Sequence, residues 1–364
     1  MLISLFAPAL LCAAALPQEE IILMDGRILD VQRITGETYS EVTYKTATGT
    51  GRKDAEQVRE LKHAYGSRLL NTYADGRDLM VDEQYVVAIQ AFNEVLEDKR
   101  LMTNKRYAWV KGDTLFRQVR CMFTLGDFEG VVKFVDRLLS EVPDTFYYAP
   151  ALMFKAEALE LKGDESGARA AFEQMSADVV AKGLPARWEK ESELGLLLLD
   201  KTKSGAGLRR TLEDLVALTE KSFPTVASRA TAAIGLSFIE EEKYGKAEEF
   251  FESITANDGA DDRTEASAFF GLGLCNYRRG LEMEDQDSAA DTYFEANLNF
   301  LRVVTMYRDN VSLVPKSMYY SSLCFNRSGG SANRRKAISI AGRLLKRYPN
   351  SQWTAKVKRD LNLR

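Results

Sequence analysis

The chain reads GRDLMVDEQYVVAIQAF at residues 76–92 and GLSFIEEEKYGKAEEFF at residues 235–251. Both stretches place glycine, tyrosine, alanine and phenylalanine at the same offsets, with gaps of nine, three and four residues. This spacing predicts a helical hairpin in which glycine lets two helices touch, tyrosine closes the turn, and alanine and phenylalanine pack on the next pair. Such a hairpin buries its apolar face by stacking on others, so the spacing predicts an array of repeats.

These offsets resemble the tetratricopeptide repeat (TPR), a helical hairpin of about 34 residues. Other parts of the chain fit the same pattern at the turn, packing or closing positions: Gly126-Asp127-Phe128 with Val131, Val135 and Pro143; Ala156, Gly163-Asp164, Ala168 and Phe172; Leu212, Val216 and Pro224 after Trp188; Phe269 to Gly273 with Tyr293, Ala296 and Phe300; Tyr319, Tyr320, Ala337 and Tyr348-Pro349-Asn350-Ser351. The resemblance implies a protein that binds other proteins by shape and surface, without catalysis.

One repeat carries roughly ten extra residues between its two halves, including Glu282, Glu284, Asp285 and Asp287. We expect these residues to form a solvated loop in the turn between the helices. Asp285, Asp287 and Asp291 have the spacing of a calcium hand, but Ala289, Ala290 and Ala296 stand where a ligand, the turn glycine and the bidentate glutamate are needed. The sequence therefore predicts no calcium site there.

The resulting fold class is mostly α: a right-handed TPR-like α-solenoid of roughly seven hairpins, preceded by a small antiparallel β-barrel-like domain. We expect the repeats at 66–364, ending in a lone helix that caps the open end of the solenoid. The segment Arg347-Tyr348-Pro349-Asn350-Ser351-Gln352 is also similar to sequences of TPR proteins of the bacterial cell envelope.

Residues 18–63 change to a period of two, which predicts four or five antiparallel strands. Asp25-Gly26 separates two apolar runs and is a hairpin signal, while Gly49 and Gly51 are expected to turn the chain again. The pattern is similar to small SH3-like or Sm-like barrels. Two interpretations remain open, a recognition or adaptor module and an N-terminal cap for the solenoid, and in both the unit is expected to lean on the first helical hairpin.

Composition bounds the possible partners. The chain has 364 residues, 45% apolar content and a formal net charge of −4. Since acidic and basic residues alternate along the predicted helices, nucleic acid is not expected as a partner. The dense basic stretch from Arg334 to Arg359 is expected to be a solvated face, with an anionic lipid or phosphate patch as the alternative.

The first residues, Met1 to Leu16, are almost wholly apolar and end in Ala13-Ala14-Ala15, which a signal peptidase can read. We therefore expect a signal peptide at 1–15 and export to the periplasm or cell envelope. The run is too short for a transmembrane segment. The alternative is a miscalled start, because no lysine or arginine precedes the apolar run, and Leu11 before Cys12 does not favour a lipid anchor.

Residues with catalytic or metal-binding chemistry are sparse. The single histidine, His63, is expected to be a linker residue, and no phosphate-binding loop occurs. The widely spaced Cys121, Cys275 and Cys324 predict small buried side chains instead of a zinc site or disulfides. The sequence thus predicts no enzyme, no cofactor and no metal. The alternatives are an enzyme with its site where the β-domain joins the first repeat, and a self-assembling structural protein.

The TPR resemblance also implies a binding surface, because the first helix of each repeat lines a concave groove. Its inward positions fall on these residues: Tyr73, Arg77, Met80, Phe116, Arg120, Phe123, Met153, Glu157, Glu160, Leu236, Ile239, Arg278, Tyr319, Ser322 and Asn326. Aromatic, methionine and arginine side chains suit an extended peptide or a partner helix. The expected partner is a protein or peptide, and the alternative is that several of these residues are core between repeats.

Overall fold

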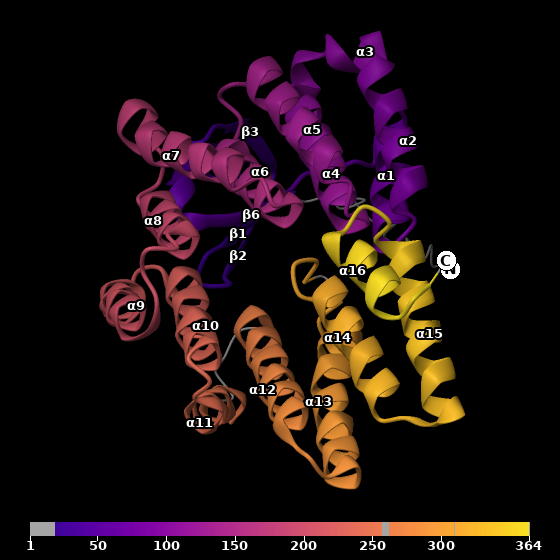
Figure 1. The fold of residues 1–364 in the computed structure, drawn as a ribbon. Coiled ribbons are helices and arrows are strands. Elements are labelled where there is room, and N and C mark those ends of the chain that lie inside the picture. Colours follow the sequence, from indigo (N-terminus) through magenta and orange to yellow (C-terminus); the bar gives the residue numbers. More distant parts are fainter. Residues whose placement is uncertain (1–18, 257–261, 309, 364) are drawn as a thin grey trace, which may run out of the picture.

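The computed structural model describes residues 19–256, 262–308 and 310–363. The expected fold class is confirmed: the chain is mostly helical, with consecutive helices like those of a TPR solenoid, and has a small antiparallel sheet region at the N-terminus (Figure 1). The expected signal peptide at 1–15 lies outside the described residues. Among the described helices, none combines the length and the apolar character needed to cross a bilayer.

Six strands in two antiparallel sheets form the N-terminal unit, which we call the β-domain. The strands are β1 (Glu19–Leu23), β2 (Ile28–Val31), β3 (Arg33–Glu37), β4 (Glu41–Thr46), β5 (Gly49–Asp54) and β6 (Val58–Lys62). The sheet orders are β2-β1-β6 and β3-β4-β5. Asp25-Gly26 does join an antiparallel pair, in which Ile22 faces Ile28.

The sequence predicts four or five strands, whereas the described part of the β-domain has six. The difference arises at two places. The expected single strand Arg27 to Ile34 is split into β2 and β3, because Gln32 leaves the first sheet and donates its N–H to the carbonyl of Lys45 at 2.9 Å. Gly49 and Gly51, expected to turn the chain, instead lie in β5 and pair with β4. The resemblance to SH3-like or Sm-like barrels stays a prediction.

The helical part consists of sixteen α-helices within the described residues. They are α1 (Asn71–Val81), α2 (Tyr85–Glu97), α3 (Lys99–Met102), α4 (Trp109–Leu125), α5 (Phe128–Glu141), α6 (Tyr148–Lys162), α7 (Glu165–Lys182), α8 (Arg187–Leu199), α9 (Gly205–Thr219), α10 (Pro224–Glu240), α11 (Tyr244–Thr255), α12 (Asp262–Glu282), α13 (Gln286–Met306), α14 (Val314–Arg327), α15 (Gly330–Arg347) and α16 (Gln352–Asp360). Apart from α3 and α16 they pair in sequence as hairpins, from α1/α2 to α14/α15 (Figure 1).

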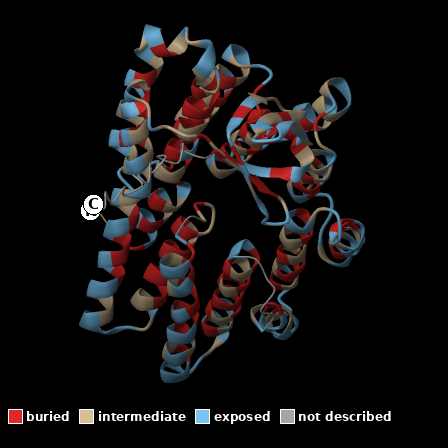
Figure 2. Cartoon of the chain, turned by 180° about the vertical axis from the view of Figure 1, so that it is seen from behind, coloured by how far each residue is buried: buried red, intermediate tan, exposed pale blue. Residues whose placement is uncertain are grey.

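The repeated residues occupy the helix contacts that their spacing predicts. A Cβ on Gly76 would lie 2.6 Å from the ring of Phe92, so only glycine fits there without a shift. Phe92, Ala88, Ala168 and Ala247 are all fully buried. Buried residues accordingly follow the faces where helices meet, while the outward faces are exposed (Figure 2).

The acidic insertion forms only a short turn, at 283–285, in place of the longer loop that we expected. Its other residues lengthen α12 and α13, which contain 21 residues each. Asp285 caps α13 by accepting a hydrogen bond from the N–H of Ser288 at 2.8 Å, and Tyr277 packs against Tyr293 across the hairpin. Helix capping and aromatic packing thus extend the hairpin to its tip.

The two ends of the helical array meet, so the chain curves into a ring (Figure 1). The side chain of Gln352 on α16 donates a hydrogen bond to the carbonyl of Leu161 on α6 at 3.5 Å. Arg347 lies 3.8 Å from Glu83 in the α1–α2 turn, and the buried Tyr348 lies beside Gly126. The lone helix α16 packs on α14 and α15, as expected of a capping helix, and its hydrogen bond to α6 shows that the end it covers also meets the earlier part of the ring.

The β-domain contacts more of the ring than the first hairpin on which we expected it to lean. The N–H of Tyr39 donates to the carbonyl of Asp144 at 3.2 Å, before α6. A carboxylate oxygen of Glu56 accepts a hydrogen bond from the N–H of Ala186 at 2.8 Å, before α8. The β-domain is thus fixed to hairpins that lie later in the chain.

Packing at the repeated alanine can be tested on one helix. Ala168 is fully buried in α7, whereas Ala170, two residues later, is exposed. Ala168→Leu is expected to lower the free energy of unfolding by about 1–3 kcal/mol, because the larger side chain overpacks the helix contact. Urea unfolding followed by circular dichroism measures this change. Ala170→Leu is the matched control, and equal stability of the two variants would contradict the assigned helix contact.

Candidate functional site

The helices of the ring border a half-open cavity of about 590 Å³, which we call the central cavity. Residues of α6, α8, α10 and α12 line it, together with the loops at 200–204 and 310–313. Because these elements belong to several hairpins, the cavity is a product of the curvature of the ring.

The space exists because α10 presents small side chains to the cavity. Ser228, Ala232, Ala233 and Ser237 all line it, and their spacing places them on one face of the helix. Leu161, Leu236 and other leucines add apolar area to the lining. The central cavity therefore combines apolar walls with charged groups, as ligand-binding pockets do.

Ion pairs connect the helices around the central cavity. Arg263 on α12 lies 2.9 Å from Glu157 on α6, and Arg229 on α10 lies 3.9 Å from the same carboxylate. Arg229 also pairs with Glu191 on α8. These contacts join four first helices, so they hold the inner face of the ring together.

The residues predicted to form a groove are not gathered in one place. Only Glu157, Glu160 and Leu236 line the central cavity. Arg120 and Arg278 are exposed elsewhere, Met80 is half-buried at the first hairpin, and Asn326 accepts a hydrogen bond from Arg334. The predicted groove residues that line the central cavity thus lie on two first helices, α6 and α10.

Other predicted groove residues belong to packing. The structure buries Tyr73, Phe123, Met153, Ile239, Tyr319 and Ser322. Phe116 stacks on Tyr147 with ring centroids 4.4 Å apart, and the Arg77 guanidinium lies 4.8 Å from the ring of Tyr65. These residues match the alternative of core between repeats. The sequence analysis did not predict other lining residues, such as Arg229. The signal that could have indicated them is the set of small residues around Arg229 on the same helix.

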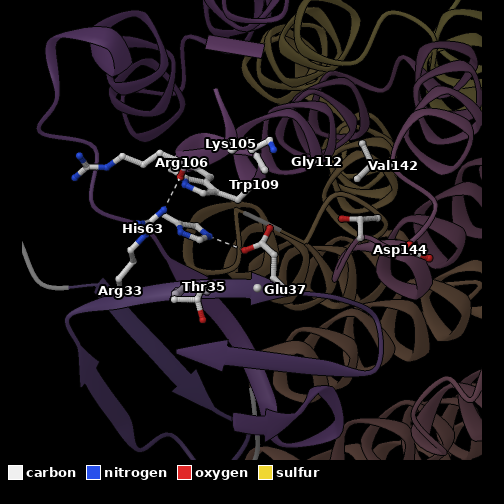
Figure 3. A pocket seen from close by; sticks show the side chains of 14 residues that line it. Arg33, Thr35, Glu37, His63, Lys105, Arg106, Trp109, Gly112, Val142 and Asp144 are labelled. Atoms are coloured by element: carbon white, nitrogen blue, oxygen red, sulfur yellow. Dashed lines mark hydrogen bonds and ion pairs between the residues drawn. The ribbon is translucent and has the colours of Figure 1, made fainter. Parts of the chain in front are cut away.

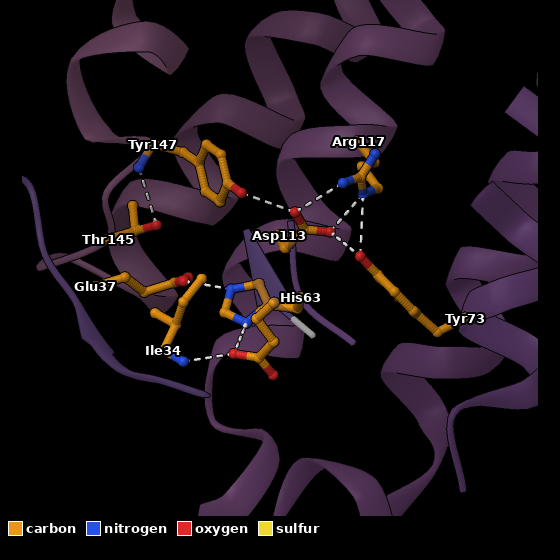
Figure 4. A network of polar contacts seen from close by, with 9 residues as sticks. Ile34, Glu37, His63, Tyr73, Asp113, Arg117, Thr145 and Tyr147 are labelled. Carbon is orange, nitrogen blue, oxygen red and sulfur yellow. Dashed lines mark hydrogen bonds and ion pairs between the residues drawn. The ribbon is translucent and has the colours of Figure 1, made fainter. Parts of the chain in front are cut away.

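His63 is not a linker residue, because it is buried between two carboxylates where the β-domain meets α4 (Figure 4). Its Nε2 lies 2.6 Å from Glu37, and its Nδ1 lies 3.7 Å from Glu19. The ring also stacks on Trp109, with centroids 3.9 Å apart. Burial opposes protonation, but Glu37 and Glu19 outweigh it and raise the pKa of His63 to about 9.

A second buried charge lies close by, at Asp113 on α4. It accepts hydrogen bonds from the hydroxyls of Tyr73 at 2.6 Å and Tyr147 at 2.8 Å, and pairs with Arg117 at 2.5 Å (Figure 4). Burial alone would raise the pKa of Asp113, but Arg117 and the two hydroxyls hold it at about 2. Asp113 therefore ties together α1, α4 and the start of α6.

A small cavity of about 190 Å³ borders the His63 cluster, at the place considered for an enzyme site (Figure 3). Both ring nitrogens of His63 face carboxylates, so neither is directed toward a substrate. A general base needs a nitrogen within reach of the proton that it removes. The arrangement is suited to holding the β-domain against α4.

Side chains that could bind a metal or act as nucleophiles lie apart from one another in the described part of the chain. Among the described residues, no cluster of three or more histidine, cysteine or acidic side chains could hold a metal ion. Cys121, Cys275 and Cys324 are buried free thiols. Burial raises the pKa of Cys121 and of Cys275 to about 12, which keeps these thiols protonated and unreactive at neutral pH.

Comparison with known proteins supports a TPR protein. Residues 316–351 match the family model of the tetratricopeptide repeat, over most of the hairpin α14/α15. A solved structure, the crystal structure of yeast Tom70, is matched with 13% identity and a TM-score of 0.25, covering 81% of this chain and 89% of that chain. No curated protein matches the chain.

The pKa of His63 predicts a pH dependence of stability. The folded protein holds this proton up to about pH 9, whereas the unfolded chain releases it near the usual value of 6.5. Stabilisation by His63 is therefore complete below pH 6.5 and is lost as the pH rises toward 9. The expected loss is about 1.4 kcal/mol per pH unit for one proton.

Denaturant unfolding between pH 6.5 and 8 measures this slope. Above this range Lys316, with its pKa lowered to about 8, adds a slope of opposite sign, because the folded protein releases its proton before the unfolded chain does. His63→Gln is expected to destabilise the protein and to remove the slope. A slope that persists unchanged in this variant would show that other groups cause it.

Proposed function

We propose that this protein is a non-catalytic scaffold that binds a protein partner, and that a short segment of the partner enters the central cavity. The observation that carries the proposal is the closed ring, whose first helices leave a cavity of about 590 Å³ on their inner side. The TPR match at 316–351 supports protein binding as the general role.

The size of the cavity limits what can enter. Ligand pockets commonly measure roughly 300–1,000 Å³, so the central cavity fits a segment of a few residues. An open TPR groove would accept a long extended peptide or a helix, but α16 reaches α6 and leaves a shorter space. The rest of the partner would then contact the rim and outer surface of the ring.

A non-catalytic role agrees with the chemistry of the site. The buried titratable groups beside the small cavity, His63 and its two glutamates, are engaged with one another. Among the charged groups in the lining, Arg229 and Arg263 are likewise engaged in ion pairs with Glu157, which suits recognition better than proton transfer.

Export to the bacterial periplasm or cell envelope is part of the proposal, supported by the apolar run from Met1 to Leu16 and by Ala13-Ala14-Ala15. The mature protein is expected to begin near Leu16. Intact mass of the protein recovered from its native host measures this directly, and a cytosolic form that retains Met1 would contradict export.

Filling the central cavity tests partner binding. Ala233→Phe places a ring in the lining and is expected to reduce copurification of the partner by about tenfold or more, because the ring occupies the space that the segment needs. Quantitative mass spectrometry of tagged protein from crosslinked cells measures the recovery. Ala170→Phe, at an exposed helix position, is the matched control. Full recovery with a folded Ala233→Phe protein would place the partner on another surface.

A further inference from the structure

Four charged side chains at one side of the central cavity have no hydrogen bond or ion pair among the described residues. Glu160 on α6 and Glu240 on α10 belong to the cavity lining. Lys316 on α14 and Lys356 on α16 lie beside the lining: Lys316 follows the lining residue Leu313 by one turn and is coupled electrostatically to Lys356 and to both glutamates. We refer to these four residues as the unpaired charges.

The two lysines rest on aromatic rings. The Nζ of Lys316 lies 4.6 Å from the ring centroid of Phe270 and 5.6 Å from that of Trp353. The Nζ of Lys356 lies 4.0 Å from the centroid of Trp353. An ammonium within about 6 Å of a ring face is attracted to it, so these contacts fix both lysines beside one indole.

The charges of opposite sign act on one another without forming an ion pair. Burial, and then repulsion by Lys356, lower the pKa of Lys316 to about 8, while Glu160 and Glu240 act in the other direction. Burial, and then repulsion by Glu157, raise the pKa of Glu160, while Arg229 and Lys316 act in the other direction. Two carboxylates and two ammonium groups thus influence one another electrostatically in the region between α6, α10 and α14.

We propose that the central cavity binds a peptide segment carrying one basic and one acidic side chain, the basic one between Glu160 and Glu240 and the acidic one at Lys316 and Lys356. This inference rests on the proposed function and adds the chemistry of the bound segment. Hydrogen bonds between opposite charges are the strong ones, and here each charged group of the segment meets protein charges that lack a partner.

A segment with one sign of charge fits less well. A purely basic segment would satisfy the glutamates and add a third positive charge near Lys316 and Lys356. A purely acidic segment would satisfy the lysines and add another negative charge near Glu160, whose ionisation Glu157 already disfavours. Only a segment of mixed charge removes both imbalances.

Short synthetic peptides test the proposal on the full chain. Five-residue peptides of glycine and serine with blocked ends carry lysine and glutamate in either order, lysine alone, glutamate alone, or neither. Calorimetric titration is expected to show that a mixed-charge peptide binds about tenfold or more tightly than the others. Trp353 fluorescence should change on binding, since the indole contacts both lysines.

Charge-neutral variants assign the two halves of the site. Glu160→Gln with Glu240→Gln should remove the advantage that the lysine of the peptide gives, and Lys316→Met with Lys356→Met should remove the advantage of its glutamate. Glu249→Gln and Lys346→Met, at exposed positions, are the matched controls and should leave binding unchanged. The single variants Glu240→Gln and Lys356→Met carry the test if a double variant does not fold.

The outcomes separate this inference from the proposed function. Equal binding of all peptides would overturn the charge inference and leave segment binding in the cavity intact. Absence of binding by every peptide would also overturn the inference, and copurification with Ala233→Phe would then decide the proposed function independently. Peptide binding that only the control variants alter would place the site outside the central cavity.

Discussion

The contact between a glycine on one helix and a phenylalanine on the next determines the geometry on which the whole ring depends. At Gly76 the ring of Phe92 fills the space that a Cβ would need, and Gly235 meets Phe251 in the same way. Each such contact fixes how two helices cross. Repeated along the chain, the crossings add up to a curvature that brings α16 to α6. The central cavity is therefore a consequence of helix packing.

The sequence predicts the hairpins well because the residues that form each hairpin lie close together in the chain. Glycine, alanine and phenylalanine of one unit lie within two adjacent helices, so their spacing reports directly on helix contacts. Asp25-Gly26 predicts its β-turn for the same reason. The acidic segment after Glu282 misled the prediction, because composition suggested a loop while the cap at Asp285 and the contact of Tyr277 with Tyr293 extend the helices.

Contacts between distant segments could not be predicted from the sequence. The residues next to His63 in the sequence do not indicate that it is buried. Its partners Glu19 and Glu37 are brought to it by the folding of the β-domain. Glu157 was placed on the inner face by its position in the repeat, but its arginine partners follow from the curvature. For Tyr73 the repeat position predicts a side chain in the groove, but the structure buries it and its hydroxyl donates a hydrogen bond to Asp113.

Closure of the ring also affects the kinetics of association. A segment inside a closed ring enters by a free end or waits until the ring opens, so the encounter rate depends on opening as well as on diffusion. The ion pair of the half-buried Arg347 with the exposed Glu83 lies at the surface, and surface ion pairs contribute about 0–1 kcal/mol. Part of the closing contact is therefore weak. A weak seam opens readily, which favours exchange of the segment that we propose to bind while its affinity remains set by the cavity.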